Sequence, residues 1–406
     1  MLSGCGSNSP DDPLQPEATP VATSSAPETL TQSGGVPGVF DDRVVFGQSA
    51  AFSGPAQQLG INMNLGIMAA FEEANRNGGV HGRTLELTTR DDAYEPEAAI
   101  INTQALINDE QVFSLIGAVG TPTSRSATPV AAEAGIPYVA PFTGAGFLRD
   151  DNWDNIINLR ASYAQETEEM VERLTTDLGI TRIAVMFQDD SFGRAGYNGA
   201  LAALERRGMN LVATGVYPRN TTAVKSGLLD LRLGNPEAVI LIGAYQPVAA
   251  LISWARHIGF DPIFMTVSFV GSNALADELG ARGEGVYVTQ VIPFPTDLSI
   301  PVVASYTDAL VAYDPEADPG FVSLEGYIAG RLAISGLEGC GEDLTRDCFL
   351  ENILGAGRFE IDGFVLDFGD ESTQTVDNQG SDAVFLTAID ANGRYRSETS
   401  MGDANP

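Results

Sequence analysis

The chain has 406 residues and a formal net charge of −32, from 54 acidic residues against 22 basic ones. This length is too great for one hydrophobic core and is comfortable for two domains. A surface of that sign repels nucleic acid and anionic membranes, and two histidines with three cysteines do not favour a Cys/His metal site.

The N-terminus carries a candidate lipidation signal. Leu2-Ser3-Gly4-Cys5 is similar to a bacterial lipobox, in which the cysteine is lipidated and becomes the mature N-terminus. Only Met1 precedes it, so either the true start lies upstream or the match is chance. The next segment is rich in Ser, Pro, Thr and acidic residues, which favours a lipidated Cys5 followed by a tether. We therefore expect a lipobox remnant at 1–5 and a disordered tether at 6–42.

From Arg43 onward, apolar runs alternate with helical patterns, which predicts a parallel sheet with helices on its faces. Thr121 is the predicted N-cap of the third helix, with Pro122 at its first helical position. The expected strands of this first unit are 44–50, 85–92, 113–117 and 136–141, and the expected helices are 60–77, 95–109 and 122–134.

The pattern then restarts, so the sequence predicts two similar α/β units and not one long sheet. Its expected strands are 182–188, 211–217, 238–243 and 262–266, with helices such as 193–207 and 247–257 between them. Further on we expect strands at 285–291, 363–368 and 383–389, and helices at about 299–313 and 323–337.

Cys340 and Cys348 lie close together in the sequence, within EGCGEDLTRDCF. A disulfide that closes this small loop suits a protein outside the cytoplasm. The alternative is a pair of free thiols. We predict the disulfide.

Ligands of open parallel sheets bind beyond the carboxyl ends of the strands. In both units the residues at these ends are hydroxyls, glycines and aromatics, with no histidine or cysteine. Such a set binds by hydrogen bonding and stacking and lacks a nucleophile–base pair, so we expect no catalytic residue, no metal and no cofactor.

Several of these segments resemble a known family. SGPAQQLG (53–60), ANRNGGVHGRTLELTTRDDAYEP (74–96), GTPTSRSATPVAAEAGIPYVAP (120–141) and DDSFGRAGYNGAL (189–201) are similar to the branched-chain amino acid (Leu/Ile/Val) binding family. These are the type I periplasmic substrate-binding proteins of ABC transporters. The resemblance implies an α/β fold of two Rossmann-like lobes hinged by three crossovers, each a parallel sheet with helices on both faces. It implies lobe 1 at 43–160 plus 296–357, lobe 2 at 161–295 plus 358–400, and a tail at 401–406.

The resemblance also implies roles for single residues. Thr121, with nearby backbone N–H groups, matches the residue that holds the ligand carboxylate, and Thr143 with Gly144 matches a second polar contact. Phe192 and Tyr245 match the aromatics that cover the ligand from the second lobe. The complete candidate ligand-binding set is Ser53, Thr121, Pro122, Thr123, Thr143, Gly144, Tyr163, Phe192, Tyr245, Ser268, Phe269 and Glu325.

One position departs from the family pattern. Amino-acid binders place an acidic residue where Ser268 stands, and that acid pairs with the ligand ammonium. A buried ammonium needs an opposing charge. Either Glu325 or another acid supplies it here, or the ligand is not a zwitterionic amino acid.

The resemblance implies an extracytoplasmic solute-binding protein that captures a small polar ligand, an amino acid or related carboxylate or amide, and delivers it to an ABC transporter permease. We expect a monomer in the periplasm or at the cell surface, attached to the membrane by its lipid alone. One alternative is a sensor of the same fold that feeds a signalling partner. Another is an α/β enzyme that uses Asp91, Asp92, Asp189 or Asp190 as acid–base groups.

Overall fold

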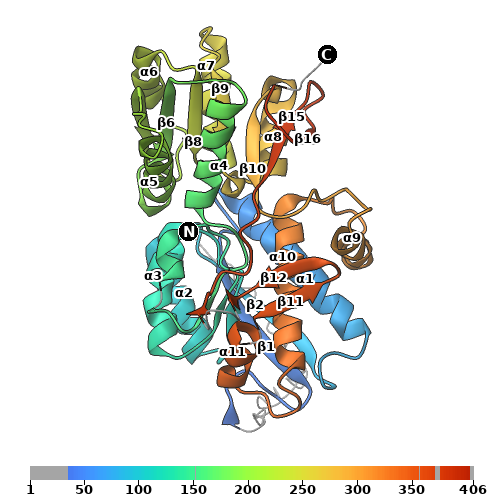
Figure 1. Ribbon diagram of the computed structural model, residues 1–406. Coiled ribbons are helices and arrows are strands. Elements are labelled where there is room, and N and C mark those ends of the chain that lie inside the picture. Colours follow the sequence, from blue (N-terminus) through green and yellow to red (C-terminus); the bar gives the residue numbers. More distant parts are fainter. Residues whose placement is uncertain (1–34, 151, 356, 371–374, 403–406) are drawn as a thin grey trace, which may run out of the picture. The chain divides into compact units, whose positions relative to one another are not determined.

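Two β-sheets organise the part of the chain that the computed structural model describes, residues 35–402 without 151, 356 and 371–374 (Figure 1). The first sheet has the order β2-β1-β3-β4-β5, and all its strand pairs are parallel. Its strands are β1 (Arg43–Ala50), β2 (Thr84–Asp91), β3 (Ser114–Ile116), β4 (Tyr138–Val139) and β5 (Ile156–Ile157).

Helices cover both faces of this sheet, because each carries an apolar stripe that must be buried. In Figure 1, α2 and α3 lie on one side, and α1 and α10 lie on the other. The helices of this lobe are α1 (Gln57–Arg76), α2 (Pro96–Asn108), α3 (Thr121–Glu133), α9 (Pro301–Tyr313), α10 (Phe321–Glu338) and α11 (Arg346–Gly355).

The second sheet has the order β16-β15-β10-β9-β8-β6-β7. Five of its strands are parallel, and β15 and β16 add an antiparallel edge. The strands are β6 (Ile183–Gln188), β7 (Ala213–Tyr217), β8 (Ala238–Ile242), β9 (Ile263–Thr266), β10 (Tyr287–Gln290), β15 (Phe385–Ile389) and β16 (Tyr395–Glu398). The helices around it are α4 (Tyr163–Thr176), α5 (Ser191–Glu205), α6 (Lys225–Gly234), α7 (Tyr245–His257) and α8 (Ser272–Leu279).

Hydrogen-bonded caps begin two helices of the second lobe. Ser162 and Gln165 form a capping box at the start of α4. The Asp190 side chain accepts hydrogen bonds from the backbone N–H groups of Phe192 and Gly193 at the start of α5. The predicted fold class, two α/β lobes, is therefore confirmed.

The chain crosses between the lobes three times, after β5, after β10 and before β15. The predicted third crossing lies at 357/358, and the structure corrects this. The hairpin of β11 (Arg358–Ile361) and β12 (Phe364–Asp367) packs against α10, where Arg331 Nη1 donates to Asp362 Oδ2 at 3.0 Å. The other lobe limits stay predictions.

The predicted tether also ends earlier than residue 42. Val39 is buried and pairs with Val44, and Gly38 lies so close to Phe113 that a Cβ would meet its backbone nitrogen at 2.0 Å. An apolar side chain that reaches the core orders the segment just before β1. Residues 6–34, and the candidate lipidation site Cys5, lie outside the described residues.

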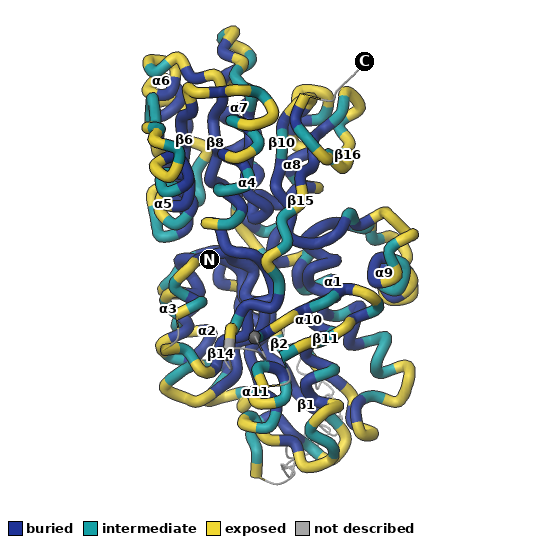
Figure 2. The backbone as a smooth tube through the Cα atoms, viewed as in Figure 1, coloured by how far each residue is buried: buried dark blue, intermediate teal, exposed yellow. Residues whose placement is uncertain are grey.

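Burial follows the layers (Figure 2). The strands of both sheets are mostly buried, while exposed residues gather on loops and on the outer faces of helices. No helix among the described residues combines the length and the apolar character that a bilayer span requires.

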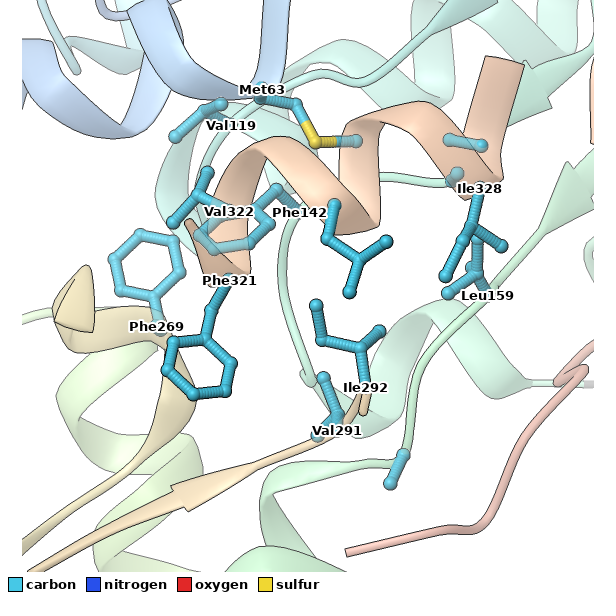
Figure 3. Close-up of a cluster of buried hydrophobic side chains, with 14 of the residues drawn as sticks. Met63, Val119, Phe142, Leu159, Phe269, Val291, Ile292, Phe321, Val322 and Ile328 are labelled. Atoms are coloured by element: carbon cyan, nitrogen blue, oxygen red, sulfur yellow. The ribbon is translucent and has the colours of Figure 1, made fainter. Parts of the chain in front are cut away.

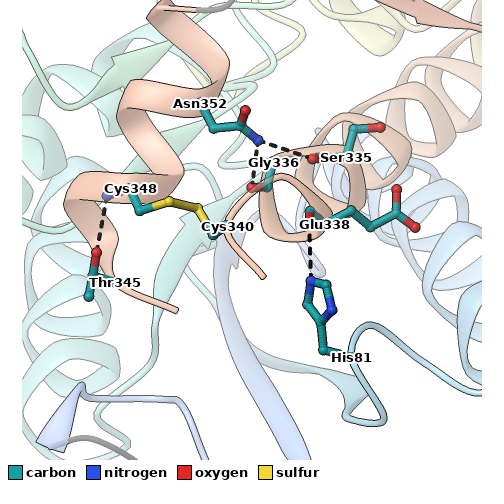
Figure 4. The surroundings of a disulfide bond; sticks show 8 residues. All are labelled: His81, Ser335, Gly336, Glu338, Cys340, Thr345, Cys348 and Asn352. Carbon is teal, nitrogen blue, oxygen red and sulfur yellow. Dashed lines mark hydrogen bonds between the residues drawn. A yellow bond between two sulfur atoms is a disulfide. The ribbon is translucent and has the colours of Figure 1, made fainter. Parts of the chain in front are cut away.

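The predicted disulfide is confirmed. Cys340 follows α10, and Cys348 lies on α11, so the bond joins the two helices (Figure 4). Asn352 Nδ2 donates to Gly336 O at 3.0 Å and supports the same junction. Closing a loop this short stabilises the fold by roughly 2–3 kcal/mol in the chain-entropy account.

Helices α1 and α10 approach each other at Gly66, where a Cβ would lie 1.9 Å from the Ser323 carbonyl oxygen and 2.6 Å from the Tyr327 nitrogen. We expect Gly66→Ala to lower the free energy of unfolding by about 2 kcal/mol, because overpacking outweighs the better helix propensity of alanine. Urea unfolding measures the change. Gly146→Ala is the control, since no atom lies within 4 Å of a Cβ there. Equal stability of Gly66→Ala and the parent would contradict this packing.

Candidate functional site

The start of α3 differs from its prediction. Thr121 is the first residue of the helix, not its N-cap; the N-cap is Gly120, whose φ is 105°. A Cβ at Gly120 would lie 2.2 Å from Cε2 of Tyr94, so glycine is required for this ring to approach. The Thr121 hydroxyl makes no cap and lies 2.7 Å from Thr143 Oγ1.

The hydroxyls of three candidate residues form a chain. Thr143 Oγ1 donates to Tyr163 OH at 3.3 Å and lies beside Thr121 Oγ1. A Cβ at Gly144 would lie 2.8 Å from Cδ1 of Tyr163, so this glycine allows the Tyr163 ring to pack closely. The first lobe supplies both threonines, Thr121 as the first residue of α3 and Thr143 from the loop after β4, and Tyr163 is the first residue of α4.

Thr123 and Pro122, the neighbours of Thr121, are buried and stabilise the first turn of α3. The Thr123 hydroxyl donates to the carbonyl oxygens of Val119 and, at 3.1 Å, Gly120. Pro122 occupies the second position of α3 and is buried.

Five aromatic rings meet between the two sheets, where the carboxyl ends of their strands converge. The Phe269 centroid lies 4.5 Å from Phe192, 5.5 Å from Phe142, 6.0 Å from Tyr94 and 6.5 Å from Tyr163. All five residues are buried. Phe269 belongs to η3 (Ser268–Val270) of the second lobe, and Figure 3 shows its ring beside Phe142 and the α10 residue Phe321.

A buried guanidinium lies on the other flank of Phe142. Arg160 Cζ is 4.7 Å from the Phe142 centroid, and its side chain is fully buried. Arg160 Nε lies 3.5 Å from Glu325 Oε1, and Nη2 lies 3.9 Å from Glu166 Oε1. Arg160 also donates to the Ser268 hydroxyl.

Glu166 holds Ser268 in place. It accepts hydrogen bonds from Ser268 N at 2.8 Å, Ser268 Oγ at 2.9 Å and Thr289 Oγ1 at 2.6 Å. Burial raises the pKa of Glu166, while Arg160 acts to lower it. Two carboxylates, those of Glu166 and Glu325, therefore lie near Ser268. Both are paired with Arg160 of the protein itself.

The ligand-binding set predicted from the sequence does not include Tyr94, Phe142, Arg160 or Glu166. A signal existed for Arg160, because a charged residue interrupts the apolar run IINLRAS and must be paired if the run is buried. Tyr94 gave no such signal, since its place depends on Gly120, 26 positions later in the chain.

Two candidate residues lie apart from the hydroxyl and aromatic cluster. Ser53 is exposed, and its backbone N–H donates to Asp91 Oδ1 at 3.2 Å. Tyr245 starts α7 and lines a groove of about 1040 Å³ together with Gln58 of α1.

Polar contacts join the lobes at the edge of the aromatic cluster. Arg219 Nη2, after β7, lies 2.6 Å from Glu95 Oε2, after β2. Asn220 Nδ2 donates to Glu95 Oε1 at 2.7 Å and to Ala93 O at 3.2 Å. The structure therefore holds the two lobes in contact across the ends of their strands.

The four aspartates that an enzyme would use are engaged in local structure. Asp91 accepts from the backbone of Phe52 at 2.9 Å, and Asp92 accepts from Ser49 Oγ at 2.8 Å. Asp190 caps α5, and Asp189 pairs with the exposed Arg194 at 2.7 Å. In the described part of the chain, no three His, Cys, Asp or Glu side chains gather as a metal site.

Burial raises the pKa of Glu325 to about 7; Arg160 and Arg149 act to lower it, and Glu166 raises it. The folded state holds the Glu325 proton more tightly than the unfolded chain does. The contribution of this proton to the free energy of unfolding is therefore complete below the unfolded pKa of about 4.5 and is lost as pH rises through about 7. Between about pH 4.5 and 7, we expect the free energy of unfolding of Glu325→Gln, measured relative to the parent, to rise by about 1 kcal/mol per pH unit.

Urea unfolding at pH 5, 6, 7 and 8 measures the difference, with the exposed Glu97→Gln as a control for the loss of one carboxylate. A difference that is constant with pH, or that falls as pH rises, contradicts the buried-acid assignment.

Comparison with known proteins agrees with this geometry. A model of the family described as periplasmic binding protein matches residues 43–394. A possible leucine/isoleucine/valine-binding protein from Rhodopirellula baltica SH 1 has 39% identity and a TM-score of 0.83, covering 90% of this chain and 97% of that one. The Leu/Ile/Val-binding protein homolog 7 of Brucella abortus (strain 2308) is 28% identical over 75% of this chain and 79% of its own.

A periplasmic binding protein type 1 from Bordetella pertussis Tohama I shares the fold at 18% identity, with a TM-score of 0.77 and coverage of 88% of this chain and 100% of that one. The family match spans most of the chain, and the alternation of two lobes with three crossings fits it. The chain belongs to the periplasmic binding protein family.

Proposed function

We propose that this protein captures a small carboxylate- or amide-bearing solute between its lobes and passes it to the permease of an ABC transporter. Members of this family are solute-binding proteins, and its relatives in Brucella abortus and Rhodopirellula baltica are named for leucine, isoleucine and valine. The observation that carries the proposal is the meeting of the Thr121 and Thr143 hydroxyls at the start of α3, beneath aromatic rings from both lobes.

The chemistry of this position suits a carboxylate or an amide oxygen. The first turn of a 13-residue helix carries a partial positive charge and N–H groups without helical partners. Two hydroxyls add donors that rotate toward an acceptor. The aromatic rings exclude water, which strengthens these hydrogen bonds.

Capture and release follow from the hinge. Ligand bound between the lobes adds contacts that exist only when they are closed, so it shifts the population toward the closed form. The Arg219–Glu95 contact and the hydrogen bond of Asn220 to Glu95 join the lobes directly, so they favour the closed form whether or not ligand is bound. A permease that recognises both lobes would then distinguish loaded from empty protein.

Family membership implies an extracytoplasmic location. We propose further that Cys5 carries the lipid that anchors the protein, that residues 6–34 serve as the tether, and that the protein acts as a monomer.

The test of the site is Thr121→Ala. We expect it to weaken binding about 10- to 100-fold, because it removes one hydrogen bond to a charged group. A thermal-shift panel of leucine, phenylalanine, their amides, 4-methylpentanoate and 3-phenylpropanoate first identifies a compound that binds the parent. Calorimetry then gives its Kd for parent and variant.

Thr128→Ala is the matched control, since Thr128 lies buried on the same helix and outside the cluster. We expect it to bind like the parent. If Thr121→Ala binds the compound as tightly as Thr128→Ala does, the hydroxyl site is wrong; if no panel member binds the parent, the proposed solute class is wrong.

A further inference from the structure

One aromatic side chain of the second lobe fills the space beside the hydroxyl chain. The Phe269 ring lies within 4.5 to 6.5 Å, centroid to centroid, of Tyr94, Phe142, Tyr163 and Phe192. We call the space bounded by these four rings the aromatic chamber. Its walls come from four separate strand or helix ends, two in each lobe, and Phe269 is its occupant in this structure.

The segment that carries Phe269 is a single 3-10 turn. It spans Ser268–Val270 and ends at Gly271, whose φ is 80°. Because Glu166 and Arg160 hold Ser268 in place, the Phe269 ring leaves its position by rotation about its own side-chain bonds and not by movement of the turn. An incoming ring that takes the place of Phe269 restores the ring-to-ring contacts that this side chain gives up.

The polar end of the chamber is the hydroxyl chain. Tyr163 belongs to both features, since its ring is a wall and its OH accepts from Thr143 at 3.3 Å. A carboxylate attached to a ring in the chamber therefore meets Thr143 and Thr121 directly.

The surroundings offer no free anion for an ammonium group. The described residues include three buried carboxylic acids, of which Asp92 and Glu166 accept hydrogen bonds from protein donors and Glu325 is ion-paired with Arg160 at 3.5 Å. Asp92 accepts from Ser49 and from Tyr94 N, Glu166 from Ser268 and Thr289, and Glu325 faces Arg160. Arg160 itself lies on Phe142, so a second cation beside that ring would be repelled.

We infer that the ligand of this protein is an aromatic carboxylic acid without an ammonium group, and that its ring displaces Phe269 from the aromatic chamber. This inference rests on the proposed function and narrows its solute class. The carboxylate binds Thr121 and Thr143, the four rings hold the aromatic group, and no buried charge of the ligand is left unpaired.

Four compounds test separately how the aromatic ring and the ammonium group of a ligand affect its binding to the full-length protein. 3-Phenylpropanoate and phenylalanine differ only in the ammonium group, as do 4-methylpentanoate and leucine. We expect 3-phenylpropanoate to bind at least tenfold more tightly than each of the other three in calorimetry. Tighter binding of leucine or phenylalanine overturns the inference and leaves the proposed function standing.

Tighter binding of 4-methylpentanoate rejects the aromatic part and, with it, the inference. If none of the four binds while another compound of the thermal-shift panel does, the inference also fails without the proposed function. If no compound of the panel binds the parent, both the inference and the proposed function are wrong.

Phe269→Ala tests the displacement itself. We expect 3-phenylpropanoate to bind this variant at least tenfold more tightly than the parent, because the ring no longer has to be moved. Phe321→Ala is the matched control, since Phe321 is a buried phenylalanine of the same apolar core that packs on Phe294 and Tyr395 and is not one of the four walls (Figure 3). Equal or weaker binding to Phe269→Ala overturns the displacement, and the four-probe comparison on the parent decides the ligand class even if this variant does not fold.

Discussion

The burial of the Arg160 guanidinium determines how the two lobes meet. A fully buried cation is costly unless carboxylates and hydrogen bonds compensate it. Glu325 comes from α10 of the first lobe, Glu166 from α4 of the second, and Ser268 from the turn before α8. Because Arg160 itself lies at the first crossing, one charge ties the hinge to both lobes and fixes the turn that carries Phe269.

That constraint explains why the candidate site is hydroxylic and aromatic. Arg160 and its partners use the charged groups near the hinge, so the remaining walls are rings and threonines. Gly120 and Gly144 then decide how close the rings come, since a Cβ at either position would strike Tyr94 or Tyr163. The aromatic chamber is thus neutral because Glu166 and Glu325 are paired with Arg160.

Much of the fold was predictable, and much of the site was not. Alternating apolar runs and helical patterns gave most strands of both sheets within a few residues, because burial on both faces leaves a continuous signal. The short β5 and the amphipathic α4 were not predicted, and neither was the place of the β11–β12 hairpin. Local spacing indicated Thr121, Thr143, Phe192 and Phe269 as strand-end residues. Tyr94, Phe142, Arg160 and Glu166 depend on contacts far apart in the sequence, which no local pattern records.

The most direct test of the central claim is a crystal structure of the protein with the compound that gives the largest thermal shift. The account predicts its carboxylate or amide oxygen within hydrogen-bonding distance of Thr121 and Thr143, with rings of both lobes around the rest. A compound bound elsewhere, such as in the groove lined by Tyr245 and Gln58, would contradict it.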